Sequence, residues 1–217
     1  TAILPRRKNL KDLVFAGFFS QNGHGDGYSH NLYVGRIDRL TVRASYFRQA
    51  RGGHLLKSRA RSSDIAYNRI TDENGGMASY EIDLPNGGEA RIVGNLIEQS
   101  PATRNATIVS YGAEGYTWPE NRLVFAYNTV VDRRASGGVF VKALPGRARA
   151  VLANNLFVGR GVFAIEIPSD EKGNFFPQLR SFVSPERYDF RPRKTADFVG
   201  RAVVKSPAAW SSVFATD

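Results

Sequence analysis

The sequence predicts an all-β protein, a right-handed parallel β-helix of about six coils followed by an irregular C-terminal cap. A short segment recurs along the chain at intervals of 23 to 33 residues, a spacing typical of solenoid proteins. Within each repeat, apolar residues occur in short runs or alternate with polar residues, as they do in strands, and no helical stripe of useful length is present. Because stacked coils pair their strands side by side, we expect parallel sheets.

The repeated segment is centred on an asparagine in the four later repeats and on a glycine or a serine in the two earlier ones. Each segment has an apolar residue three positions before this anchor and another two positions after it. The anchors are Gly17, Ser45, Asn68, Asn95, Asn128 and Asn155. Asparagine tolerates left-handed backbone angles, so we expect it at the bend between two sheets, where its amide can bond to the next coil. The anchor asparagines are therefore assigned to structure, not to an active site.

A second strand is expected after each anchor, so that every coil carries at least two strands. These strands are 30–34, 54–58, 80–84, 107–111 and 139–143. The chain then forms a single domain, with an N-terminal arm at 1–12, coils at 13–165 and a cap or tail at 166–217. The coil that begins near Leu13 would expose its apolar face unless the arm covers it, so we also expect that upstream coils precede this chain.

The composition limits the range of partners. With 42% hydrophobic residues the chain can bury a continuous core, and without cysteine it can form neither disulfides nor thiolate metal sites. No stretch approaches the ~20 apolar residues that span a bilayer. The net charge of +10 favours a polyanion such as an acidic polysaccharide, or simply marks a basic soluble protein. The basic residues are dispersed and no nucleic-acid-binding motif is present, so nucleic acid is not expected as a partner. The oligomeric state is left open.

The asparagine-anchored coils and the segment 183–192, with its Tyr188-Asp189-Phe190-Arg191, resemble the pectate-lyase-like superfamily of right-handed β-helix proteins. The resemblance covers residues 13–191. It implies a bacterial protein that acts on polysaccharides and is secreted, periplasmic or bound to the cell surface. This superfamily includes polysaccharide lyases, glycoside hydrolases, epimerases and proteins without known enzymatic activity, so the fold does not select one function.

A more local likeness concerns Lys57 and Ser58. The stretch 55–59, followed by the anchored strand 65–70, is similar to the alginate lyases and chondroitinases of the β-helix type. In that family a Lys-Ser pair just before such a strand supplies the catalytic base, and Lys57 occupies this place. The family also has an arginine where this chain has Asp83, and paired calcium-binding glutamates where this chain has Leu55 and Leu56.

Strand alternation assigns the side chains around Lys57 to the inside or the outside of the solenoid. The expected inward row is Leu32, Leu56, Ile82, Val109 and Val141. One expected outward row, called here the outer row, is Tyr33, Lys57, Asp83, Ser110 and Lys142. The second, called here the corner row, is Asn31, Leu55, Glu81, Ile108 and Phe140. Because successive coils are ~4.8 Å apart, Tyr33, Lys57, Asp83 and Glu81 are expected within one sugar-sized patch.

All three histidines, His24, His30 and His54, fall in the first two coils, and the loop 22–30 adds flexible glycines, Asp26 and Tyr28. Strict alternation turns His30, His54 and Tyr80 inward, where they would stack as a buried polar ladder. A bulge at the ends of these short strands would reverse their direction and make them catalytic or substrate-binding residues. A metal site is the third alternative.

The leading functional hypothesis is a lyase that cleaves an acidic, uronate-containing glycan by β-elimination. Such an enzyme needs a base and a cation that neutralises the uronate carboxylate. We expect the catalytic residues among Lys57, Tyr33, His30 and His54, and a carboxylate-binding role for Arg59. The other substrate-binding candidates are Tyr28, Glu81, Asp83, Ser110 and Lys142.

Two alternatives use the same residues differently. A glycoside hydrolase needs two carboxylates, which Asp83 would supply together with Glu81 or Asp26, although Glu81 and Asp83 also suit a salt bridge with Lys57. A non-catalytic carbohydrate-binding or surface-structural β-helix needs only the hydrogen bonds and stacking of these rows. Calcium is the one cofactor considered, with Asp26, Glu81 and Asp83 as its ligands.

Overall fold

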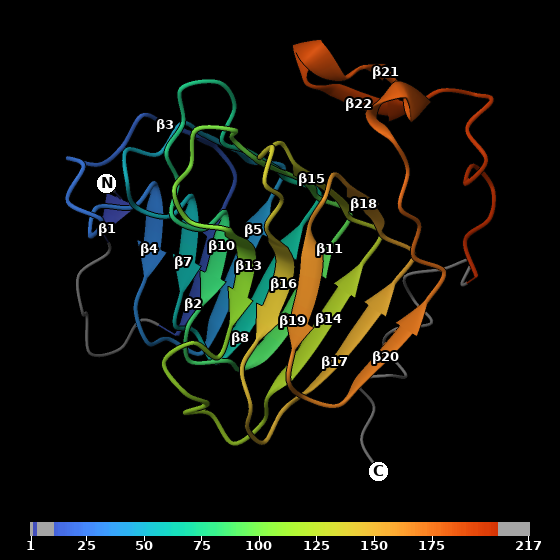
Figure 1. The fold of residues 1–217 in the computed structure, drawn as a ribbon. Coiled ribbons are helices and arrows are strands. Elements are labelled where there is room, and N and C mark those ends of the chain that lie inside the picture. The colour runs from blue at the N-terminus through green and yellow to red at the C-terminus, as the bar shows by residue number, and fades with distance from the viewer. Residues whose placement is uncertain (1, 4–10, 204–217) are drawn as a thin grey trace.

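The protein is a right-handed parallel β-helix with three strands in each coil, and its computed structural model describes residues 2–3 and 11–203 (Figure 1). Sheet A consists of β1 (Ala2–Ile3), β4 (Leu32–Val34), β7 (Leu56–Ser58), β10 (Ile82–Leu84), β13 (Thr107–Tyr111), β16 (Val139–Ala143) and β19 (Val162–Ile165). Sheet B consists of β2 (Asp12–Phe15), β5 (Arg39–Arg43), β8 (Ser62–Ala66), β11 (Glu89–Val93), β14 (Arg122–Ala126), β17 (Arg149–Ala153) and β20 (Ser169–Lys172). Sheet C consists of β3 (Phe18–Ser20), β6 (Tyr46–Arg48), β9 (Arg69–Thr71), β12 (Leu96–Gln99), β15 (Thr129–Asp132) and β18 (Leu156–Val158).

Each coil passes through sheets B, C and A in turn, so the sequence repeat spans the bend between sheets B and C. The expected inward row of sheet A is confirmed. Leu32 pairs with Leu56, and the same pairing continues through the following coils of sheet A. The row is Leu32, Leu56, Ile82, Val109 and Val141, all with 0% exposure. These side chains belong to one core that runs through the stack, as an all-parallel solenoid requires.

The asparagine ladder is also confirmed, and it is longer than expected. The backbone N–H of Asn68 donates to Oδ1 of Asn95, and the same bond repeats at every coil up to Asn174. At the lower end the N–H of Ser45 donates to Asn68, and Ser45 Oγ accepts from Gly17. Asn174 follows β20, so coils continue beyond residue 165.

The left-handed residue at each bend is not the anchor. It is the residue just before the anchor, with φ of 57° at Tyr67, 68° at Gly94 and 56° at Tyr127. The expectation that asparagine itself takes this conformation is therefore wrong. The bend is completed one residue earlier, and the anchor is left with its N–H and its amide pointing along the stack. Gly94 is required for a further reason, because a Cβ there would lie 2.7 Å from the ring of Tyr67.

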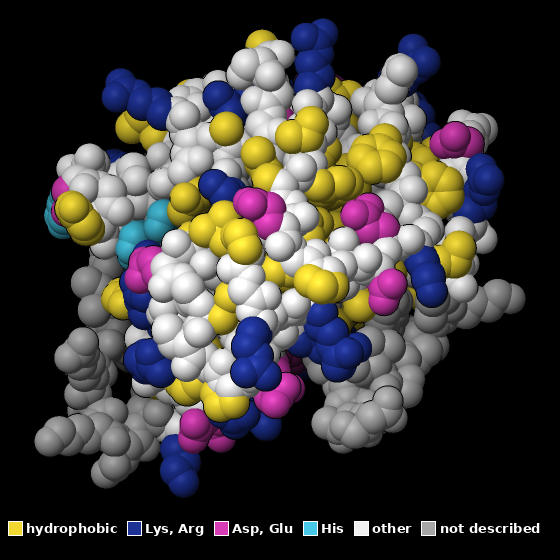
Figure 2. All heavy atoms as spheres, turned by 60° about the horizontal axis from the view of Figure 1, so that its bottom comes forward, with side chains coloured by type: hydrophobic (Ala, Val, Ile, Leu, Met, Phe, Trp, Pro, Cys, Tyr) yellow, Lys and Arg dark blue, Asp and Glu magenta, His cyan; other side chains and the backbone are white. Residues whose placement is uncertain are grey.

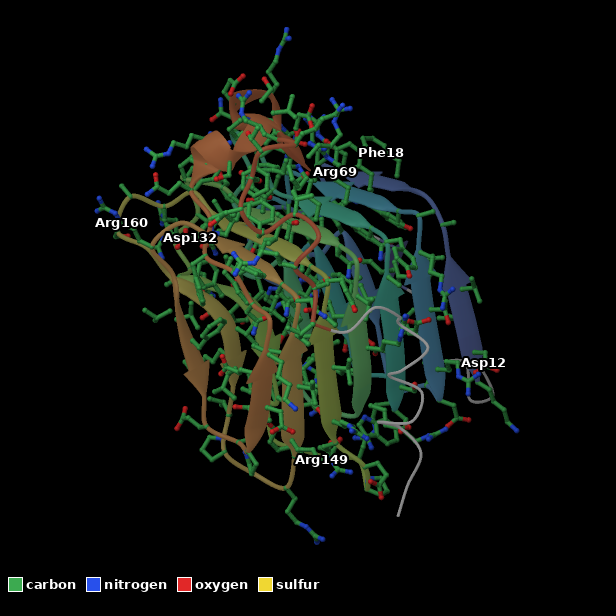
Figure 3. All side chains as sticks on the ribbon, turned by 90° about the vertical axis from the view of Figure 1, so that its right-hand side faces the viewer. Asp12, Phe18, Arg69, Asp132, Arg149 and Arg160 are labelled. Atoms are coloured by element: carbon green, nitrogen blue, oxygen red, sulfur yellow. The ribbon has the colours of Figure 1, made fainter. Side chains whose placement is uncertain are left out.

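The segment 183–192 does not close the end of the stack. It forms an antiparallel hairpin, β21 (Phe182–Ser184) and β22 (Asp189–Pro192), next to the 3₁₀ turns η1 (Leu179–Ser181) and η2 (Pro185–Arg187). Phe182 and Phe190 pack on the outward side chains of sheet C, Val131 and Val158. The hairpin therefore covers the outer face of sheet C, and Figure 3 shows Arg69 lying beneath it.

The N-terminal arm expected at 1–12 falls largely outside the described residues, although Ala2–Ile3 adds a strand to sheet A beside β4. Among the described residues, no helix has the length and apolar character of a membrane span.

Candidate functional site

The outer row lies on the outer face of sheet A as predicted. Lys57 is in register with Tyr33 on one side and with Asp83 on the other, and the row continues through Ser110 to Lys142. Lys57 Nζ lies 3.1 Å from Asp83 Oδ2, so the two side chains form an ion pair between adjacent coils. Short parallel strands thus bring residues that are 26 positions apart in sequence into contact.

The corner row points into the solenoid, contrary to the prediction. All five of its members are buried with 0% exposure: Asn31, Leu55, Glu81, Ile108 and Phe140. The Nδ2 group of Asn31, for example, donates to the carbonyl oxygens of Phe19 and Arg48 at the ends of sheet C strands. Asn31, Leu55 and Glu81 lie one residue before their strands, where the chain turns from sheet C into sheet A, so alternation does not extend back to them. Ile108 and Phe140 are the second residues of β13 and β16, and alternation is already lost at these strand starts. Glu81 is therefore inaccessible to a surface ligand.

His30 and His54 also point to the side opposite to the one predicted, since both lie in the turn from sheet C into sheet A. The rings of His30 and His54 stack with centroids 4.5 Å apart, and Tyr80 stacks on His54 at 4.9 Å. This histidine stack (His30, His54 and Tyr80) faces the outer row, since His54 Nε2 lies 3.4 Å from Asp83 Oδ2. The predicted stacking is confirmed, but the inward direction is wrong. His30 and His54 are nevertheless largely covered, with 6% and 7% exposure.

Both histidines are held in the neutral form. The N–H of His54 donates to His30 Nδ1 (2.9 Å), and the N–H of Tyr80 donates to His54 Nδ1 (3.2 Å). A nitrogen that accepts a hydrogen bond carries no proton, so each ring is protonated at Nε2 alone. Burial lowers the pKa of His30 to about 4, with a contribution from Lys57, and burial lowers that of His54 to about 2, with contributions from His30 and Lys57. At neutral pH both rings are therefore neutral and carry their N–H at Nε2.

Asp83 lies beneath Lys57. Its side chain is only 3% exposed, and it contacts the lysine ammonium and the His54 ring. Burial raises the pKa of Asp83, while the charge of Lys57 and its hydrogen bond act in the opposite direction. Asp83 therefore offers little accessible surface to a surface ligand, and its contacts are with Lys57 and His54.

The centre of the site is the contact between Arg59 and Glu114, and Glu114 was not among the residues predicted from the sequence. The guanidinium of Arg59 donates from both Nη atoms to the carboxylate of Glu114, at 2.6 and 2.8 Å, and Lys57 Nζ lies 3.5 Å from the same carboxylate. Hydrogen bonds from Arg59 lower the pKa of Glu114, and the charges of Arg59 and Lys57 add to this effect. Arg59 also donates to Tyr33 Oη (3.0 Å) and to Asn86 Oδ1 (2.6 Å).

Glu114 and Asn86 share a place in the fold with Arg59. Arg59 follows β7 directly, Asn86 comes two residues after β10, and Glu114 comes three residues after β13. The carboxyl ends of adjacent parallel strands meet at one edge of a sheet, so polar residues just beyond these ends converge. The positions of these polar residues are visible in the sequence, but alternation assigns directions only within strands and not to residues beyond the strand ends.

The remaining predicted residues are dispersed. Ser110 is buried beside Asp83, and Lys142 is the next residue in the row. Tyr28 lies on the loop 22–30 and is 84% exposed, while Asp26 accepts the N–H groups of Tyr28 and Ser29 in a local turn. Those two backbone bonds lower the pKa of Asp26.

The calcium ligands considered above are not brought together. Glu81 is inside the solenoid, Asp83 is on its outer face, and Asp26 is engaged in its own loop. Within residues 2–3 and 11–203, no group of three or more carboxylates or histidines is arranged to hold a metal ion.

Comparison of the chain with protein-family models, with characterised proteins and with solved structures gave no match. The class of protein that the fold defines is therefore the parallel β-helix, and the function has to be argued from the site alone.

Proposed function

We propose that the protein binds an acidic, uronate-containing polysaccharide along the outer face of sheet A and cleaves it by β-elimination. The observation that carries this proposal is the carboxylate of Glu114, which is held by Arg59 in a two-pronged contact and approached by Lys57. The carboxylate of a uronate has the same shape and charge, and it fits the same guanidinium fork when Glu114 moves aside. Glu114 is suited to this exchange because its side chain is 48% exposed, on a turn.

The other residues supply the chemistry of elimination. Arg59 neutralises the carboxylate and so acidifies the neighbouring C–H. Lys57, in its amine form, takes this proton; the electron pair forms the C=C bond, and the bond from carbon to the leaving oxygen breaks. Tyr33, within hydrogen-bond distance of Arg59, protonates the leaving oxygen. His54 and His30 contribute only as hydrogen-bond donors.

The resemblance to the pectate-lyase-like superfamily, and to alginate lyases and chondroitinases around Lys57, supports the same substrate class. Extended polymers match a sheet face whose side chains repeat at each coil. Acidic polysaccharides of this kind are extracellular, so we propose that the protein acts outside the cytoplasm.

A second candidate is a carbohydrate-binding β-helix without catalysis. It is favoured by the pairing of Lys57 with both Asp83 and Glu114, because an ammonium ion has no lone pair with which to remove a proton. In this candidate Arg59 and Lys57 hold the carboxylates of the glycan, and no bond of the glycan is broken.

The test is the appearance of unsaturated uronate, measured by ultraviolet absorbance, on a panel of alginate, pectate and glycosaminoglycans. Lys57→Ala should reduce the rate by at least about 10²-fold, the range expected for loss of a general base, while leaving the circular dichroism spectrum unchanged. Lys172→Ala is the matched control, since Lys172 is exposed on sheet B.

Retained activity in Lys57→Ala would reject Lys57 as the base. Glycan binding without any unsaturated product or new reducing end would support the non-catalytic alternative. If no acidic glycan of the panel is bound or cleaved, the proposed function is wrong.

A further inference from the structure

A concave surface lies beyond the carboxyl ends of the sheet A strands, next to the contacts of Arg59 with Glu114 and Asn86, which are called here the Arg59 site. It is formed by the turn 112–121, which joins β13 to β14, and by the turn 144–148, which joins β16 to β17. Its volume is about 550 Å³, within the range of small-molecule sites. We call it the aromatic cleft; its main lining residues are Tyr116, Trp118, Pro119, Pro145 and Arg147.

The walls of the aromatic cleft are fixed in place. Tyr116 Oη donates to the carbonyl oxygen of Leu144 (2.7 Å), which ties the two turns together. The ring of Tyr116 lies directly on Gly112 and Gly146, where a Cβ atom would come within 2.4 Å of it. The side chain of Asn121 donates to the carbonyl oxygen of Trp118 and accepts from the N–H of Gly88. A cleft held in this way needs little reorganisation to accept a ligand.

The cleft and the strand beside it carry arginines that form no ion pair with a carboxylate of the described residues. Arg147 and Arg149 are both exposed, and within the described residues neither forms an ion pair with a carboxylate. Arg149 is in register with Arg122, and burial together with the charge of Arg149 lowers the pKa of Arg122. Figure 3 shows Arg149 at the lower ends of the strands, and Figure 2 shows Lys and Arg side chains, with Asp and Glu side chains among them, over the lower half of the face that it draws. Arg147 lines the cleft, so its guanidinium is placed to attract an anion that binds there.

The aromatic cleft and the Arg59 site share structural elements. Glu114 and Trp118 lie on the same turn, four residues apart. Asn86 accepts from Arg59 through its side chain and from the N–H of Thr117 through its carbonyl oxygen (3.2 Å). A chain of sugars that leaves the Arg59 site toward the carboxyl edge of sheet A therefore reaches the cleft directly.

We infer that the aromatic cleft is a distal subsite for a uronate unit of the same acidic glycan, with Trp118 and Tyr116 contacting the sugar ring and Arg147 its carboxylate. Flat aromatic and proline surfaces suit the apolar face of a pyranose ring, and the guanidinium supplies the two-pronged contact for the carboxylate. The inference rests on the proposed function, since it assigns the direction in which the glycan extends from Arg59.

The test is calorimetric titration of the full chain with oligogalacturonates, oligoalginates and hyaluronan oligosaccharides, each as a disaccharide and as a hexasaccharide. Lys57→Ala serves as the background in which the oligosaccharides are not cleaved. For the glycan that binds, the hexasaccharide should bind more tightly than the disaccharide. Adding Arg147→Ala should weaken hexasaccharide binding about three- to tenfold and leave disaccharide binding unchanged.

Trp118→Ala should have a similar effect, and Arg147→Ala keeps the test valid if that variant unfolds, because Arg147 is an exposed residue on a turn. Arg160→Ala is the matched control, because Arg160 is exposed and lies at the upper left in Figure 3, away from Arg149 at the lower ends of the strands. This replacement should change the affinity for neither the disaccharide nor the hexasaccharide. Hexasaccharide binding that is no tighter than disaccharide binding, or that is unaffected by Arg147→Ala, would overturn the subsite while leaving the proposed function standing. Failure of every oligosaccharide to bind would overturn both.

Discussion

Replacement of Asn128 by alanine is expected to lower the free energy of unfolding by about 3–5 kcal/mol. Asn128 is buried at the centre of the ladder, and its side chain makes four hydrogen bonds. Oδ1 accepts from the N–H and the Nδ2 group of Asn95, and Nδ2 donates to Asn155 Oδ1 and to the carbonyl oxygen of Ile92. Alanine supplies none of these bonds, and the buried partners are left without water to replace them.

The matched control is Asn74→Ala, which removes the same atoms at an exposed turn and should change stability by less than about 0.5 kcal/mol. Asn128→Ser should lie between the two, because Ser45 shows that a hydroxyl can accept the N–H from the neighbouring coil. Chemical denaturation followed by circular dichroism measures all three. A loss of under 1 kcal/mol in Asn128→Ala would show that the ladder follows the fold and does not stabilise it.

The ladder was predictable because its signal is periodic. Each coil must present the same hydrogen-bonding groups to the next, so the same residue type recurs at Asn68, Asn95, Asn128 and Asn155. The outer row was predictable for the same reason, since alternation holds within a strand. The left-handed residue was not found, because Tyr67, Gly94 and Tyr127 have no side-chain chemistry in common and share only a position.

The site was less predictable because it is built where the periodicity ends. Glu81 and His54 precede their strands by one and two residues, and there the chain is turning a corner, so alternation assigned both to the wrong side. Glu114 lies beyond the other end of sheet A, and its contact with Arg59 joins residues 55 positions apart. Such convergence depends on the path of the turn, which has no repeat in the sequence. The sequence alone therefore does not predict the two hydrogen bonds between Arg59 and Glu114.

The interior carboxyl groups lead to the second prediction, which concerns stability and pH. Glu81 is fully buried, and neither of its oxygens has a hydrogen-bond partner among the described residues. Burial raises its pKa well above the usual value, and the nearby carboxyl groups of Asp72, Glu98 and Asp132 raise it further. Burial also raises the pKa of Asp72 and of Glu98 to about 7, although backbone N–H groups bond to both and Arg133 faces Glu98. Burial raises the pKa of Asp132 as well, against its contacts with Arg134.

These shifts set the sign of the pH dependence. Above about pH 4 the unfolded chain loses these carboxyl protons while the folded protein keeps them, so the free energy of unfolding falls as pH rises through the folded pKa values. His30 and His54 act in the opposite sense, because the unfolded histidines bind protons below about pH 6.5 and the buried ones do not. Above about pH 6.5 the histidines no longer contribute, and the carboxyl groups alone set the slope.

We therefore expect stability to decline as the pH rises above about 6.5, by about 1.4 kcal/mol per pH unit for each carboxyl group that still keeps its proton in the folded protein. Glu81→Gln should make this decline shallower, because the amide is neutral at every pH and the folded protein no longer has to bind a proton at this position. The free energy of unfolding should rise by about 1.4 kcal/mol for each pH unit over which Glu81 keeps its proton in the parent chain. Glu120→Gln makes the same change on an exposed turn and should leave the profile as it is. Urea unfolding across this pH range gives the slope for each protein, and equal slopes for Glu81→Gln and the parent chain would show that Glu81 is not a source of the pH dependence.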